Sequence, residues 1–92
     1  KAVELAPDEA RILDTLGTVL LGSGDAQAAL KPLSKAANLT KRSDIQLNYA
    51  EALIAAGQRT EARQVLEQQV SITDLPDDLR GRAKDLEARL GE

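Results

Sequence analysis

The chain contains no cysteine and no histidine, and its only aromatic residue is Tyr49. Without cysteine there are no disulfides and no thiolate metal sites, and the redox compartment is left open. Without histidine, the commonest general base and the commonest metal ligand are both missing. Since Phe, Trp and Met are missing as well, the core must be built from Leu, Ile, Val and Ala, which favours packed helices over a sheet.

Long apolar runs and an excess of positive charge are also missing. No apolar run approaches the ~20 residues of a membrane-spanning helix, so we expect no membrane span. The chain has 12 Lys and Arg against 15 Asp and Glu, a formal net charge of −3, and no clustered basic stripe. Because affinity for nucleic acids comes largely from neutralised phosphates, we expect no nucleic-acid partner. The 92 residues suffice for one small domain.

Apolar residues recur at spacings of three and four along most of the chain, which is typical of amphipathic helices. In the stretch 9–21 we expect a broad buried face made of Ile12, Leu13, Leu16, Val19 and Leu20. After a short helical segment at 1–5, the pattern predicts helices over 9–21, 26–38, 44–56, 61–70 and 76–90. The connections are short, so neighbouring helices should pack antiparallel.

Local signals for helix ends accompany this pattern. We expect the first segment to stop at Ala6-Pro7 and the next helix to begin at the N-cap Asp8. Asp25 and Thr60 are the expected N-caps of two further helices, and Pro76 suits the first turn of the last one.

The chain also matches itself when it is shifted by 33 residues. Gly17 then falls on Ala50, and Gly24 falls on Gly57. A second shift brings Ala50 onto Ala83. A helix-turn-helix unit of about 34 residues is the length of a tetratricopeptide repeat.

The sequence resembles the tetratricopeptide repeat family in its motifs as well. One copy is LGTVLLGSGDAQAALKPLSKA (16–36), with a Leu-Gly pair, Gly-Asp at the turn and then Ala; YAEALIAAGQRTEARQVLEQ (49–68) is a second copy. The copies depart from the family pattern at Lys41 and Gln69. The resemblance implies an all-α, right-handed α-solenoid of antiparallel hairpins. The expected parts are the end of a preceding repeat (1–7), two repeats (8–41 and 42–74) and a C-terminal capping helix (75–92).

Small residues recur at equivalent positions of the two copies, and we interpret them as packing residues. The set comprises Gly17, Gly24, Ala29, Ala50, Gly57, Ala62 and Ala83. Gly17 and its equivalents should lie where two helices of a hairpin approach closely, opposite Ala29 and Ala62. Gly24 and Gly57 should end helices in a left-handed backbone conformation.

The acidic and hydroxyl side chains do not point to catalysis. The nearest approach to paired carboxylates lies at 77–78 and 85–87, where neighbouring helix residues project in different directions. We expect two i,i+4 ion pairs instead, Asp78 with Arg82 and Asp85 with Arg89. The serines have no histidine to activate them, and no strand precedes Gly22-Ser23-Gly24 to make it a phosphate-binding loop. We therefore expect no enzyme, no metal and no cofactor.

In the family that the sequence resembles, the first helix of each hairpin lines a concave groove that binds peptides. Transferred by register, the groove residues are Arg11, Asp14, Thr18, Leu21, Asp44, Asn48, Glu51, Ala55, Arg80 and Lys84. The carboxylate clamp of some chaperone-binding members needs Lys and Asn where this chain has Asp14 and Thr18, and only Asn48 agrees. The resemblance therefore implies a protein or peptide partner, without that particular specificity.

Two functions remain open at this point. One is a peptide-binding or protein-binding scaffold; the other is a structural C-terminal end-piece of a longer solenoid, which the charged stretch 80–89 and a start inside a repeat both favour. The pattern is also similar to the C-terminal repeats of bacterial multi-repeat proteins encoded with exopolysaccharide export systems. That similarity leaves the compartment open between cytoplasm and periplasm.

The apolar residues near the start of the chain predict self-association. Val3 and Leu5 belong to a helix without a hairpin partner in this sequence, and Ile12 and Val19 lie on a neighbouring face. Because a repeat of a solenoid relies on its neighbours to bury its core, we expect two copies to pair through this edge across a two-fold axis.

Overall fold

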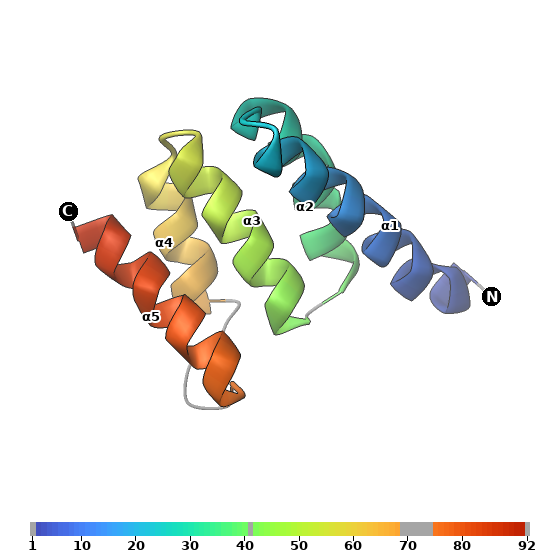
Figure 1. Ribbon diagram of the computed structural model, residues 1–92. Coiled ribbons are helices and arrows are strands. Elements are labelled where there is room, and N and C mark those ends of the chain that lie inside the picture. The colour runs from blue at the N-terminus through green and yellow to red at the C-terminus, as the bar shows by residue number, and fades with distance from the viewer. Residues whose placement is uncertain (1, 41, 69–74, 92) are drawn as a thin grey trace.

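The computed structural model describes residues 2–40, 42–68 and 75–91, and for residues 2–8 it describes the backbone. The described residues form five helices and no strand (Figure 1). The helices are α1 (Ala2–Gly22), α2 (Ala26–Leu39), α3 (Ser43–Ala55), α4 (Arg59–Gln68) and α5 (Asp77–Gly91). The expected all-α class is therefore confirmed.

The helices form two consecutive hairpins followed by a single helix. α1 packs on α2, α3 packs on α4, and α2 contacts α3, so the hairpins stack in chain order. α3 also touches both α1 and α5. In Figure 1, α1, α3 and α5 follow one another across the molecule, with α2 and α4 behind them. The result is a layer of three helices backed by a layer of two.

The core is built from leucine and alanine, as the composition requires. Its largest cluster joins α3, α4 and α5 and contains Leu47, Ala50, Leu53, Ala62, Leu66, Leu75, Ala83, Leu86 and Leu90. Two smaller clusters lie where α2 meets α1 and α3, with Ala10, Ala36 and Ile45 in one and Ala29, Leu33 and Ala52 in the other. Tyr49 is half-buried against two of the clusters.

The turns inside the two hairpins have the same construction. Gly24 and Gly57 have φ angles of 89° and 86°, in the left-handed region, as expected. In each turn the amide after the glycine donates to a carbonyl five residues earlier, at 3.0 and 2.8 Å. The Asp25 carboxylate then accepts a hydrogen bond from the Ala28 amide at 3.2 Å and caps α2, which confirms this N-cap.

Several expected helix boundaries are wrong. α1 runs without a break through Pro7, so the chain does not stop there and Asp8 is not an N-cap. Pro7 lies just past the first turn of α1, where its missing N–H removes one backbone hydrogen bond, and the helix continues through it. α4 begins at Arg59, which places Thr60 inside the helix, and α5 begins one residue after Pro76. The expected helix end at 70 and residues 71–74 of the connection that follows it lie outside the described residues.

The expected buried face of α1 is only partly correct. Leu13 and Leu20 pack against the core clusters. Ile12, Leu16 and Val19, however, are 66%, 51% and 60% exposed. The reason is that α2 and α3, the helices in contact with α1, cover only part of its circumference. Exposure of Ile12 and Val19 agrees with the uncovered edge expected there, while the side chains of Val3 and Leu5 lie outside the described residues.

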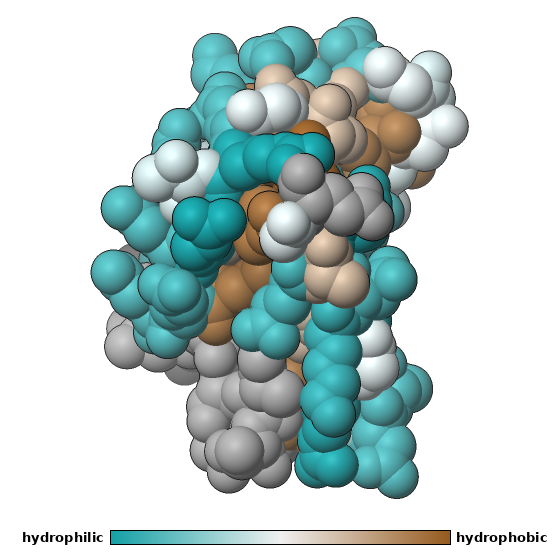
Figure 2. Space-filling model, turned by 90° about the vertical axis from the view of Figure 1, so that its left-hand side faces the viewer, coloured by the Kyte–Doolittle hydropathy of each residue, from teal (hydrophilic) through white to brown (hydrophobic). Residues whose placement is uncertain are grey.

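The opposite end of the molecule is closed by α5. Ala83, Leu86 and Leu90 turn inward and are buried against α3 and α4. Figure 2, which views this side of the molecule, shows a mainly hydrophilic surface with a narrow apolar strip in its middle. α5 thus covers the end of the core with a polar exterior.

Candidate functional site

The candidate site is the side of the three-helix layer on which the polar residues of α1, α3 and α5 meet; we refer to it as the α1–α3–α5 face. Two side-chain hydrogen bonds cross it. Asn48 on α3 donates from Nδ2 to Oδ1 of Asp14 on α1 at 2.7 Å. Arg82 on α5 donates to Oε1 of Glu51 on α3 at 2.6 Å. Asn48 and Glu51 lie three residues apart and are therefore neighbours on α3, which is linked to both flanking helices.

The bond between Asn48 and Asp14 joins equivalent helices of successive hairpins. The two residues are 34 positions apart in the chain, and both are half-buried. A hydrogen bond to an ionised carboxylate is stronger than one between neutral groups, more so where water is partly excluded. This bond therefore fixes α1 relative to α3 along the face.

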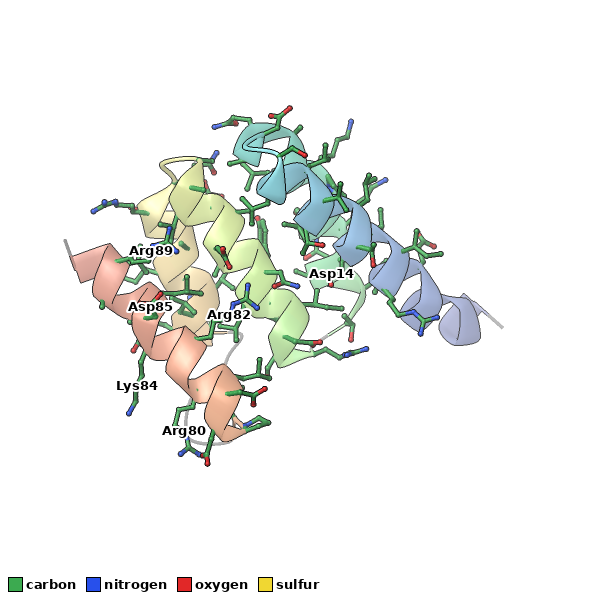
Figure 3. All side chains as sticks on the ribbon, in the orientation of Figure 1. Asp14, Arg80, Arg82, Lys84, Asp85 and Arg89 are labelled. Carbon is green, nitrogen blue, oxygen red and sulfur yellow. The ribbon has the colours of Figure 1, made fainter. Side chains whose placement is uncertain are left out.

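The ion pair between Arg82 and Glu51 replaces one that the sequence pattern predicts. The side chains are 33% and 34% exposed, so the pair is partly shielded from water. The predicted i,i+4 pair of Arg82 with Asp78 is wrong, because α5 lies against α3 and Arg82 points toward that helix (Figure 3). The predicted pair of Asp85 with Arg89 is not formed either among the described residues.

The two groove residues predicted on α5 do not lie on this face. Arg80 donates to the backbone carbonyl of Leu75 at 3.0 Å and pairs with Asp77 at 3.4 Å, which fixes the start of α5. In Figure 3, Arg80 and Lys84 both point away from α3. The α5 residue that reaches α3 on this face is Arg82, through its bond to Glu51. No pattern in the sequence singles out Arg82, because the 33-residue register places Lys84, which is also basic, at the position equivalent to Glu51.

The other predicted groove residues serve several purposes. The Thr18 hydroxyl donates to the carbonyl of Thr15 on its own helix at 3.0 Å, and Leu21 packs against a core cluster. Asp44 forms an ion pair with Arg42 at 2.9 Å, near the start of α3. Ala55 is exposed in the last turn of α3, and Arg11 is exposed on α1.

The arrangement offers hydrogen-bond acceptors rather than reactive groups. Asp14, Asp44 and Glu51 contribute three carboxylates, against the guanidinium groups of Arg42 and Arg82. The described residues contain no group of three or more acidic side chains that could hold a metal ion. No helix among them is long and apolar enough to cross a bilayer.

Comparison with known proteins identifies the class. A family model of the tetratricopeptide repeat matches residues 20–90, which is most of the chain. The protein therefore belongs to the tetratricopeptide repeat family, as its repeat length and motifs indicate. Neither the curated proteins nor the solved structures yielded a significant match. Tetratricopeptide repeats are in general a non-catalytic fold that mediates protein interactions, so a general scaffold role follows from the family.

Proposed function

We propose that the chain binds a peptide segment of a partner protein on the α1–α3–α5 face. The observation that carries this proposal is the pair of hydrogen bonds across the face, from Asn48 to Asp14 and from Arg82 to Glu51. They hold polar side chains from three helices in fixed positions. A surface whose side chains are already ordered loses less conformational entropy when a partner binds.

The chemistry of the face indicates what such a peptide would offer. Each described bond uses one oxygen of the Asp14 or Glu51 carboxylate, and a carboxylate has capacity for several donors. Asp44 adds a third carboxylate, 39% exposed. A segment that presents backbone amides and Lys or Arg side chains therefore complements this face best.

The test is selection of binders from a displayed library of random peptides, followed by affinity measurement with a blocking variant. Ala55→Arg places a long side chain on the exposed last turn of α3 without removing an internal hydrogen bond. We expect this substitution to weaken the binding of the selected peptides at least about tenfold, corresponding to about 1.4 kcal/mol of binding free energy. Ala28→Arg, exposed on α2 in the other layer, is the matched control and should leave the affinity unchanged. Equal affinities for both variants would contradict the proposal.

A second candidate function is that of a structural end-piece of a longer solenoid, including one that serves bacterial exopolysaccharide export. It is supported by α5, which buries Ala83, Leu86 and Leu90 against α3 and α4 and has a mainly hydrophilic exterior. Terminal repeats need such a polar outer face. Under this function the chain alone selects no peptide, whereas a version extended at its N-terminus with further repeats does.

A further inference from the structure

The hydrogen bond between Asn48 and Asp14 fixes the direction of an amide as well as the position of two helices. An asparagine side chain has an oxygen end that accepts hydrogen bonds and a nitrogen end that donates them. A carboxylate only accepts, so Asn48 can bond Asp14 through its nitrogen end alone. It does so from Nδ2 at 2.7 Å, a length typical of a hydrogen bond to a charged group. The oxygen end of the amide is therefore directed away from Asp14.

The two remaining oxygens of this pair are open to a ligand. Within the part of the chain that the structure describes, neither Oδ1 of Asn48 nor Oδ2 of Asp14 accepts a hydrogen bond. The one buried side-chain nitrogen or oxygen without a partner among these residues is Nε of Arg80, so both oxygens are accessible to solvent. In Figure 3, Asp14 lies on the side of α1 that faces α3. One hydrogen-bonded pair thus offers two acceptors from two helices of the α1–α3–α5 face.

The carboxylate of Asp14 differs from the other two on the face in its partner. Glu51 and Asp44 each accept from a guanidinium group, at 2.6 and 2.9 Å, which offsets their charge. The described partner of Asp14 is an uncharged amide, so the negative charge of this pair is retained. Arg11, one turn earlier on α1, lines a groove on the outer side of that helix. The α1–α3 part of the face therefore combines a negative charge with two free acceptors.

We propose that Asp14 determines the specificity of the α1–α3 part of the face by holding the Asn48 amide in one direction. This part then selects a lysine of the bound peptide and rejects a glutamate or aspartate; the inference rests on the function proposed for the face. An ammonium group has three donors and can bond Oδ2 of Asp14 and Oδ1 of Asn48 together. A carboxylate in the same place meets a like charge and two acceptors, because the nitrogen end of the amide, which could donate to it, is held at Asp14.

The experiment starts from peptides that are selected on the unchanged chain and blocked by Ala55→Arg. Each lysine of such a peptide is replaced by glutamate in turn, and its affinity is measured for the unchanged chain and for Asp14→Asn. In Asp14→Asn the neighbour of Asn48 can itself donate, so the amide can take either direction. We expect one lysine whose replacement weakens binding at least about tenfold in the unchanged chain and about threefold or less in Asp14→Asn.

Asp44→Asn is the matched control. It also removes one negative charge from the face, but it leaves the bond between Asp14 and Asn48 in place. The tenfold effect of the lysine replacement should therefore persist in Asp44→Asn. Both variants should keep the helical circular dichroism of the unchanged chain.

Four results would overturn the inference. In the first, every lysine of the selected peptides tolerates glutamate in the unchanged chain. In the second, Asp14→Asn loses as much affinity as the unchanged chain when the lysine is replaced. In the third, Asp44→Asn reduces the effect as far as Asp14→Asn does, so that the charge of the face and not the direction of the amide sets the preference. These three leave the proposed function standing, because peptides still bind the face, whereas a library that yields no peptide blocked by Ala55→Arg overturns both.

Discussion

Gly17 on α1 lies directly against the side chain of Leu33 on α2. A Cβ atom at position 17 would come within 2.6 Å of Leu33 Cδ2, closer than carbon atoms can pack. Leu33 has no room to yield, since its exposed fraction is 0%. The close approach expected at Gly17 is therefore present, with Leu33 as the residue that fills the space.

This contact makes Gly17→Ala destabilising. Overpacking of a well-packed core generally costs about 1–3 kcal/mol, which outweighs the gain in helix propensity from replacing glycine. Gly22→Ala is the matched control, because nothing lies within 4 Å of a Cβ there and its φ is not positive. Urea denaturation followed by circular dichroism should show a clear loss of stability for Gly17→Ala and nearly none for Gly22→Ala. Equal midpoints would contradict the packing explanation.

The turn glycines respond to substitution for a different reason. At Gly57 a Cβ meets nothing within 4 Å, but the φ of 86° is unfavourable for alanine and for most other residues with a Cβ. Gly57→Ala should lower the free energy of unfolding by about 1 kcal/mol. Gly81→Ala, inside α5 with open space around it, should raise it by about 0.5–1 kcal/mol. The measurement is thermal denaturation, and shifts of the same sign would contradict the explanation from backbone conformation.

Much of this fold was predictable from local features of the sequence. The apolar spacing indicates the helices, Gly24 and Gly57 define two turns through their backbone conformation, and the Asp25 carboxylate caps α2. Pro7 misled because a single proline can remove one backbone hydrogen bond without ending the helix, and the sequence does not tell how far upstream of it the helix begins. Periodicity also marks Leu16 as apolar without telling whether any helix covers it, which depends on which neighbours are present.

The candidate site was predictable to a smaller extent. The repeat register places Asp14 and Asn48 on facing helices, and the structure joins them by a hydrogen bond. The repeat register does not give the arrangement on α5. That helix lies against α3 in an orientation that turns Arg82 toward the face and Arg80 away from it. Such a rotation arises from packing between distant residues, which the register of the helical repeat does not encode.

Gln46 gives a prediction about the joint between the hairpins. It is 2% exposed, and its Nε2 donates to the carbonyls of Ala37 and Thr40, at 2.8 and 2.9 Å, where α2 ends. Gln46→Leu leaves both carbonyls without this donor and should lower the free energy of unfolding by about 1–3 kcal/mol. Gln58→Leu is the comparison variant, because Gln58 is half-buried in a turn, and it should lower the free energy of unfolding by less. Equal losses in chemical denaturation would show that the two hydrogen bonds contribute little.

A charged analogue at the same position should make stability depend on pH. In Gln46→Glu, a carboxylate faces two carbonyl oxygens in a buried site, which disfavours the ionised form in the folded state and raises the pKa of the new group above its unfolded value. The penalty is therefore present at neutral pH and disappears as the pH falls and the carboxyl becomes a donor. The difference in unfolding free energy from the unchanged chain should be larger at pH 8 than at pH 4, and a constant difference would contradict this.

The ion pair between Arg82 and Glu51 should couple α5 to α3 energetically. A double-mutant cycle with Arg82→Ala and Glu51→Ala isolates the interaction from other effects of each substitution. The pair is short, at 2.6 Å, but each side chain is about one-third exposed, so we expect a coupling of about 1 kcal/mol at low salt, the upper end for ion pairs near the surface. In 1 M salt the Debye length falls to about 3 Å, and the coupling should shrink.

Asp78→Asn serves as the control, because Asp78 has no ion pair with Arg82 in the structure and its cycle with Arg82→Ala should give a coupling near zero. A larger coupling to Asp78 than to Glu51 would mean that Arg82 pairs along its own helix in solution, and that α5 is not linked to α3 across the face.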